Sequence, residues 1–221
     1  MFETIAQHIA ELAHVLRGYK PAIRVENGGV LQRAYALGRG VVGVGAHFGS
    51  FGLLGFAPKL LGYKGSIILT RQLNQEFARW ASRSIKQHFG AETIFRDCAR
   101  DQVVDMLERG YVVGFVSDRY ARTGGFPATF FSRRVVAVAG PAVYAKRCGS
   151  PIVVMTISRG SDGTHVIRVD GPISSEGSLE EISQRWLSTL EARIREHPEQ
   201  WIWPRPHQRA ERNAVSCQRP I

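Results

Sequence analysis

The first residues of the chain carry apolar side chains at the spacing of one helix face. Ile5, Ile9, Leu12 and Leu16 recur three or four positions apart, with charged residues and histidines between them. This pattern predicts an amphipathic helix over residues 1–18 that ends near Gly18. Such a helix can pack on a protein core or lie on a membrane, and core packing is the commoner use of the pattern.

From residue 40 onward, short apolar runs alternate with amphipathic stretches. The apolar runs predict strands at residues 40–46, 66–69, 93–95, 111–117, 151–158 and 165–169. Helical spacing predicts helices at residues 53–61, 75–89, 100–108, 139–148 and 178–196, and a Gly/Pro-rich stretch predicts a loop at 122–128. This alternation favours an α/β fold with a mostly parallel central sheet flanked by helices.

The length of the chain suits one such domain. With 221 residues and 44% hydrophobic content, it can bury one sizeable core. We therefore expect residues 1–206 to form a single domain. Residues 207–221 are polar, basic and aperiodic, which predicts a disordered tail.

Charge and cysteine content narrow the choice of partner and compartment. The 29 Lys and Arg against 19 Asp and Glu give a formal net charge of +10, which favours an anionic partner such as nucleic acid, a phosphorylated substrate, an acidic carrier protein or an anionic membrane. Cys98, Cys148 and Cys217 are odd in number and lack metal-ligand spacing, so the sequence predicts neither a disulfide framework nor a metal site. A reducing cytosol fits this content.

Two polar side chains each follow a predicted buried strand. His47 comes after the strand at residues 40–46, and Asp118 comes after the strand at residues 111–117. Reactive groups of open α/β sheets gather beyond the carboxyl ends of the strands, and an imidazole accepts a proton near neutral pH. His47 is thus a candidate general base and Asp118 its candidate partner. The plainer alternatives are a structural histidine and an aspartate that caps a turn.

The residues around His47 resemble a known motif. The run GVGAHFGSFGLLG resembles the first motif of the lipid A late acyltransferases and their lysophospholipid acyltransferase relatives. The resemblance continues in order through TRQLNQEF, GYVVGFVSDR, FFSRRVVAVAGPA with KRCGSPIVV, and IREHPEQWIWPRP, and so covers residues 35–206. It implies a glycerolipid-acyltransferase-like fold and a single-step transfer. In that reaction His47 activates an acceptor hydroxyl, which attacks the thioester of an acyl carrier protein or coenzyme A.

The resemblance also implies where the protein works and what it uses. The donor thioester is a substrate, and neither a cofactor nor a metal is implied. The acceptor would be an anionic membrane lipid or a glycolipid at the cytoplasmic face of the inner membrane. Relative to longer family members the chain lacks an N-terminal membrane helix, so we expect peripheral attachment through its basic surface and its first helix.

Four arginines are candidate contacts for anionic groups. Arg71 resembles a family arginine near the active cleft, where a guanidinium would hold phosphate or the developing oxyanion. Arg119, together with Asp118, resembles a second family region, which in related acyltransferases positions an anionic acceptor. Arg133 and Arg134 follow two phenylalanines, a combination that suits anionic lipid or an acidic carrier. Solvated surface arginines are the alternative. Nucleic acid is disfavoured as a partner because the chain carries no other nucleic-acid motif.

The chain departs from the family motif at Gly52. In the family this position, one helical turn after the histidine, holds an acid that orients the ring. Loss of the orienting carboxylate costs a serine-protease triad about 10⁴ in rate. Three explanations stay open: Asp118 orients His47, a backbone carbonyl does so and the acceptor is easier to activate, as an amine is, or the protein binds lipids or acyl carriers without catalysis.

Overall fold

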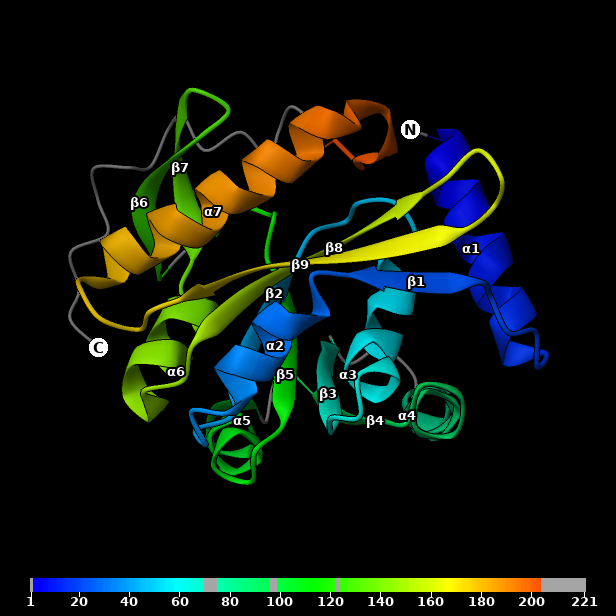
Figure 1. Ribbon diagram of the computed structural model, residues 1–221, viewed down its shortest axis with the longest axis horizontal. Helices are drawn as coiled ribbons and strands as arrows, with labels where there is room; N and C mark the ends of the chain where they lie inside the picture. The colour runs from blue at the N-terminus through cyan, green and yellow to red at the C-terminus, as the bar shows by residue number, and fades with distance from the viewer. Residues whose placement is uncertain (1, 70–74, 96–98, 122–123, 204–221) are drawn as a thin grey trace.

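The computed structural model describes residues 2–69, 75–95, 99–121 and 124–203 (Figure 1). Its centre is a seven-stranded sheet with the strand order β1-β9-β8-β2-β5-β3-β4. The strands of this sheet are β1 Ile23–Glu26, β2 Val41–Gly45, β3 Gly65–Leu69, β4 Ala91–Phe95, β5 Val112–Val116, β8 Ile152–Arg159 and β9 His165–Ile173. A separate antiparallel hairpin consists of β6 Gly125–Phe130 and β7 Arg133–Val138.

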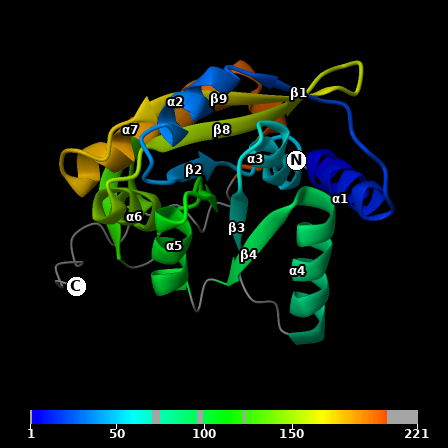
Figure 2. The same cartoon turned by 60° about the horizontal axis from the view of Figure 1, so that its bottom comes forward.

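Helices cover both faces of the sheet. The α-helices are α1 Phe2–Leu16, α2 Gly28–Tyr35, α3 Phe56–Leu60, α4 Gln75–Phe89, α5 Ala99–Glu108, α6 Gly140–Cys148 and α7 Leu179–Glu196, and two 3₁₀ turns are η1 Phe51–Gly55 and η3 Pro198–Gln200. Figure 2 shows α5, α6 and α7 on one side of the sheet and α1, α3 and α4 on the other.

The sheet is mostly parallel, as predicted. Five neighbouring strands run in one direction: β8, β2, β5, β3 and β4. The next strand, β9, is antiparallel to β8, and the edge strand β1 pairs with β9 in parallel. The predicted α/β fold class is therefore confirmed.

Alternate side chains of the central strands enter two separate cores. Val42 and Val44 of β2 belong to a buried cluster with α5, α6, α7 and the hairpin, whereas Val41 belongs to a cluster with α1, α2, η1 and α3. A β-strand points successive side chains to opposite faces, so apolar residues at every position indicate a strand that is covered on both sides. The continuous apolar runs in the sequence reflect this double burial.

The N-terminal helix docks on the second of these cores. Val15, near the end of α1, is 2% exposed and packs within that cluster. Within the part of the chain that the structure describes, no helix is long and apolar enough to cross a membrane.

The structure corrects two of the predicted elements. The loop predicted at 122–128 is wrong from Gly125 on, because β6 pairs with β7 from Gly125↔Val138 to Phe130↔Arg133 and packs against α7. The helix predicted at 53–61 is divided into the 3₁₀ turn η1 and the short helix α3. The predicted tail at 207–221 lies outside the described residues.

Candidate active site

The register of two neighbouring strands brings His47 and Asp118 together. The parallel strands β2 and β5 pair residue for residue, ending at Gly45↔Val116. Each candidate lies two residues beyond its strand, so both lie at the same carboxyl edge of the sheet. The predicted position of the site is thus built directly by strand pairing.

The two side chains form a hydrogen bond. Nδ1 of His47 lies 2.6 Å from Oδ1 of Asp118, and the aspartate side chain is fully buried while that of His47 keeps 28% exposure. Burial acts to raise the pKa of Asp118, but the hydrogen bond and charge of His47, the Trp201 indole and the charge of Arg119 together hold it below its ordinary value. The ionised carboxylate only accepts, so Nδ1 carries a proton, and in the neutral ring Nε2 is left free to accept one.

This hydrogen bond helps to choose among the three explanations for the acid that is missing at Gly52. Nδ1 of His47 faces a carboxylate rather than a backbone carbonyl. The arrangement is the one that the first explanation requires. The catalytic roles of His47 and Asp118 remain predictions.

A segment near the end of the described chain completes the surroundings of Asp118. Nε1 of Trp201 donates to Oδ2 of Asp118 at 2.9 Å, so both carboxylate oxygens are satisfied. The same segment pairs with the loop that carries the histidine. The backbone N–H of Ile202 donates to the carbonyl of His47, and Phe48 forms an isolated antiparallel β-bridge with Trp201. The PEQWIW string is therefore part of the site.

Gly49 lets this loop lie close against the sheet. Its φ is 53°, and a Cβ there would lie 2.1 Å from the carbonyl oxygen of Ile157 in β8. Its N–H donates to the carbonyl of Gln200. Only glycine fits this position, which fixes the backbone two residues after His47.

The N-terminal helix reaches the other side of the same loop. Arg159 donates from Nε to Oε1 of Glu11 at 2.6 Å and from Nη2 to Oγ of Ser50 at 2.9 Å. Ser50 in turn donates to the second oxygen of Glu11. Ser50 is fully buried three residues after His47, so this network ties α1 to the reactive loop.

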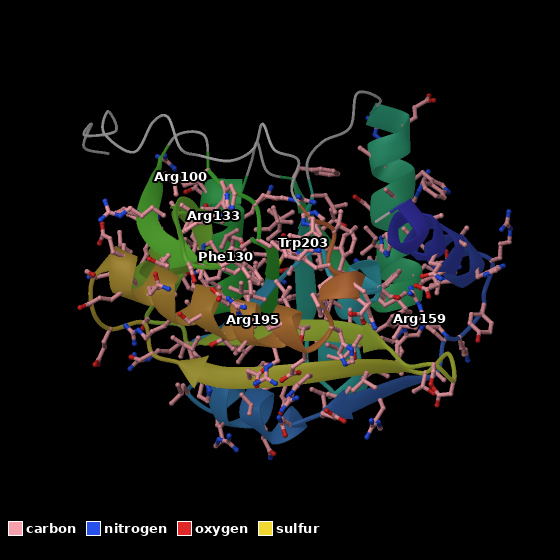
Figure 3. All side chains as sticks on the ribbon, turned by 90° about the horizontal axis from the view of Figure 1, so that it is seen from above. Arg100, Phe130, Arg133, Arg159, Arg195 and Trp203 are labelled. Atoms are coloured by element: carbon pink, nitrogen blue, oxygen red, sulfur yellow. The ribbon has the colours of Figure 1, made fainter. Side chains whose placement is uncertain are left out.

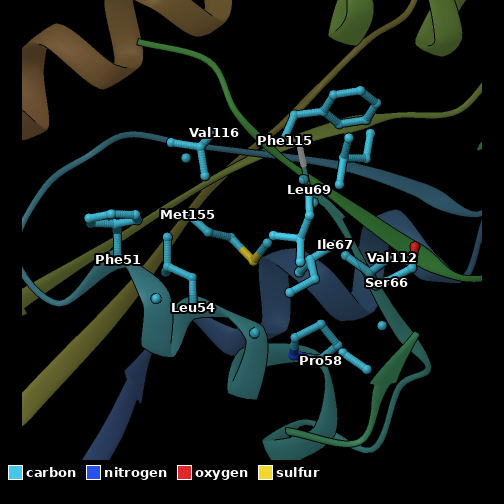
Figure 4. Close-up of a pocket in the computed structure, with 18 residues that line it drawn as sticks. Phe51, Leu54, Pro58, Ser66, Ile67, Leu69, Val112, Phe115, Val116 and Met155 are labelled. Carbon is cyan, nitrogen blue, oxygen red and sulfur yellow. The ribbon is translucent and has the colours of Figure 1, made fainter. Parts of the chain in front are cut away.

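An apolar cavity of about 140 Å³ opens beside the loop (Figure 4). Phe51, which lies 4.9 Å from the His47 ring between ring centroids, is one of its walls. The space exists because glycines at several strand positions have no side chain to fill it. Met155 reaches into it between Leu54 and Ile67. The cavity is lined by Gly43, Gly45, Phe51, Gly52, Leu54, Gly55, Pro58, Gly65, Ser66, Ile67, Ile68, Leu69, Ala91, Val112, Gly114, Phe115, Val116 and Met155.

The four predicted arginines differ in how they lie relative to His47 and Asp118. Arg119 follows Asp118 directly and its charge lowers the pKa of that carboxyl. Arg133 and Arg134 are exposed at the start of β7 and, among the described residues, neither forms a hydrogen bond or ion pair with His47 or Asp118. Arg71 lies outside the described residues.

The hairpin that carries Arg133 and Arg134 nevertheless reaches the site through its turn. Phe131 stacks on Trp201 with ring centroids 5.2 Å apart. Seen from above, Phe130 and Trp203 lie centrally, with Arg133, Arg159 and Arg195 around them (Figure 3). Trp201 is buried, whereas Trp203 packs against it and keeps 46% exposure.

Among the described residues, no group of three or more His, Cys, Asp or Glu side chains is placed to hold a metal ion.

Several residues of the site were not predicted. His8, Glu11, Phe51 and Arg159 come from three separate stretches of sequence and meet only through tertiary packing. The sequence feature that could have indicated His8 and Glu11 was their spacing in the first helix. Glu11 lies three residues after His8, so the two side chains share one helix face. That face contacts the reactive loop.

Comparison with known proteins agrees with the motifs. The model of the bacterial lipid A biosynthesis acyltransferase family matches residues 1–209. Similar curated proteins are the lipid A biosynthesis palmitoleoyltransferase of Escherichia coli (strain K12) and the lipid A biosynthesis acyltransferase of Shigella flexneri, each 27% identical over 178 residues. These alignments cover 78% of this chain and 57% of each relative, so the chain spans little more than half of their length. With its motifs in order and the family model matched over nearly all of its length, this chain belongs to the bacterial lipid A biosynthesis acyltransferase family.

Proposed function

We propose that this protein transfers a fatty acyl group from a thioester donor to a hydroxyl of a lipid or glycolipid acceptor. The observation that carries the proposal is the His47–Asp118 hydrogen bond, next to an apolar cavity whose wall residue Phe51 contacts the His47 ring. Family membership supports acyl transfer as the class of reaction, and lipid A as the class of acceptor.

The reaction needs a base and a path for one proton. Nε2 of His47 takes the proton of the acceptor hydroxyl, and the oxygen attacks the thioester carbonyl carbon. The tetrahedral intermediate then collapses, the carbon–sulfur bond breaks, and the proton passes to the departing thiolate. The products are the acylated acceptor and the free thiol. Asp118 holds the ring in the required tautomer and stabilises the imidazolium that forms.

The cavity supplies a place for the hydrocarbon chain. Each CH₂ moved from water into an apolar site contributes about 0.8 kcal/mol, so a lining that is almost wholly apolar favours an acyl tail over a polar group. Phe51 joins this cavity to the histidine, because it lines the cavity and contacts the His47 ring. A thioester carbonyl near His47 would thus place its tail in the cavity.

The net charge of +10 supports an anionic partner. An acidic acyl carrier protein or the phosphates of coenzyme A fit as donors, and an anionic membrane surface fits as the location of the acceptor. Arg71, Arg119, Arg133 and Arg134 are the proposed contacts for these groups. Peripheral attachment at the cytoplasmic face of the inner membrane completes the proposal.

The test combines purified protein with acyl carrier protein or coenzyme A thioesters and mixed lipid acceptors. We expect acylated lipid from the natural protein, and none above background from His47→Ala. His14→Ala is the matched control, because His14 is exposed on α1 and away from the loop. Undiminished transfer by His47→Ala would show the proposed mechanism to be wrong.

The alternative function is a catalytically impaired protein that binds lipids or acyl carriers, and the absent acid at Gly52 favours it. The same preparation decides between the two. Binding to lipid vesicles or to acylated carrier that persists without any product, under every donor and acceptor tried, would support the binding protein.

A further inference from the structure

The space next to Gly52 is already occupied. A Cβ built on Gly52 would lie 2.6 Å from Cε1 and 3.2 Å from Nε2 of His8, a residue of α1 that is 44 positions earlier in the chain. Contacts under 3.0 Å are essentially never made by real Cβ atoms. The His8 ring therefore fills the volume where the motif places an acid.

His8 is also linked to the proposed base through one aromatic ring. The His8 imidazole stacks on Phe51 with centroids 4.1 Å apart and an interplanar angle of 19°. Phe51 in turn meets the His47 ring at 4.9 Å and 60°. Because Phe51 also lines the apolar cavity, the position of His8 sets both the wall of the cavity and the packing of the base.

The position of His8 is fixed from its own helix. One turn further along α1, Glu11 is held by Arg159 and by the buried Ser50. Gln7 accepts a further bond from Nη1 of Arg159 at 2.8 Å. The helix thus cannot rotate or slide without breaking bonds to charged groups, which are among the stronger hydrogen bonds in proteins.

The surroundings of His8 favour a neutral ring. Burial lowers its pKa, Glu11 of the same helix raises it, and Arg159 of β8 and His47 of the reactive loop lower it. Its Nδ1 is buried and has no hydrogen-bond partner among the described atoms. A flat apolar ring would therefore lose no bond at that nitrogen.

We propose that His8 is a positioning residue for the transfer: its ring replaces the side chain missing at Gly52 and holds Phe51 against His47 and the acyl cavity. This inference rests on the proposed function for its catalytic part. Its structural part, mutual exclusion between the His8 ring and any side chain at position 52, is independent of activity.

Thermal unfolding tests the structural part. Gly52→Ala is expected to lower Tm by about 3 °C or more, since about 1 kcal/mol shifts a protein of this size by 2–4 °C. In a His8→Ala background the same substitution should lower Tm only slightly, because the ring that the added methyl group would meet is gone. An equal loss of Tm in both backgrounds would overturn the proposal.

Steady-state transfer tests the catalytic part. We expect His8→Ala to lower kcat about tenfold with KM within twofold, and His8→Phe, which keeps a ring of similar shape, to stay within threefold of the natural protein. His14→Ala on the same helix is the control. A kcat for His8→Ala equal to that of the natural protein would overturn the positioning role. If the natural protein transfers no acyl group, the proposed function fails and the positioning role fails with it, while the Tm comparison still decides the placement of His8.

Discussion

Asp118 is a buried carboxylate that faces two donors, the ring N–H of His47 and the indole N–H of Trp201. An asparagine has one acceptor oxygen and one NH₂ group, so it can satisfy only one of them. If the NH₂ faces His47, the imidazole must carry its proton on Nε2 and can no longer accept one there. If it faces Trp201, a buried donor is left unsatisfied.

We therefore expect Asp118→Asn to reduce kcat by about 10³ to 10⁴, as loss of the orienting carboxylate does in a serine-protease triad. Initial rates of thioester consumption under saturating acceptor measure this, with circular dichroism to show that the variant is folded. Because the pKa of Asp118 is lowered, the carboxylate of the natural protein stays ionised at neutral pH. A rate within threefold of the natural one would mean that Asp118 does not orient the base.

Gly114 of β5 offers a way to narrow the apolar cavity without disturbing its walls. A Cβ there would meet Ser66 O at 3.4 Å and Ile67 Cγ2 at 3.6 Å, which are ordinary van der Waals distances. We expect Gly114→Ala to shift the ratio of kcat/KM between long and short acyl donors about tenfold toward the short ones, the usual effect of one methyl group in an apolar pocket.

A series of thioesters of increasing chain length measures this shift. Gly29→Ala on α2 is the control, because a Cβ there meets only the end of Arg33 at 3.7 Å. An unchanged chain-length profile for Gly114→Ala would place the acyl tail elsewhere.

Helices and strands differ in how far the sequence predicts them. The central strands β2, β5 and β8 were predicted because burial on both faces leaves long apolar runs. The edge strand β1 has four residues and a single neighbour, which is too short for a pattern to show. In α2 two glycines begin the helix, and its stability comes from Val30 and Leu31 packed into the core rather than from intrinsic propensity.

The hairpin β6–β7 was missed for a related reason. Gly125 and Pro127 are turn-forming residues, but Pro127 lies in a strand with only one partner, where its missing N–H costs no bond in a central ladder. Within the site, His47 and Asp118 were predictable because parallel strands end together. His8 was not, because the polar face that it shares with Glu11 does not reveal where α1 docks.

The docking of α1 is expected to weaken in acid. Burial lowers the pKa of His8, whose ring packs between α1 and the loop after β2. The ring is therefore protonated more readily when the helix is detached. Its contribution to docking is complete above the ordinary histidine value of 6.5 and is lost as the pH falls below it.

Hydrogen exchange of α1 amides at pH 7.5 and 5, corrected for the intrinsic rate, measures this loss. We expect greater exposure of α1 at pH 5, a smaller change in His8→Phe, and no comparable change in α7. Equal protection of α1 at both pH values would contradict the expectation.

The excess of positive charge is a property of the entire polypeptide. A net charge of +10 attracts anionic surfaces over a distance set by the Debye length, which shrinks from about 10 Å at 0.1 M salt to about 3 Å at 1 M. We expect the protein to sediment with vesicles that contain anionic lipid at 0.1 M NaCl and to be released at 1 M. Vesicles of zwitterionic lipid alone are the control. Binding that is insensitive to salt would point to apolar insertion instead.

The loop after β2 is held from both sides by residues far apart in the chain. Glu11 of α1 contacts Ser50, and Gln200 and Trp201 contact Gly49 and Phe48. A ribosome makes Glu11 well before it makes Gln200 and Trp201. The histidine and most of the sheet emerge early, yet the loop cannot settle until residue 202 has left the exit tunnel. A growing chain of this protein is thus expected to carry an unfinished site, inert toward thioesters, until β8, β9, α7 and the segment of Trp201 are in place.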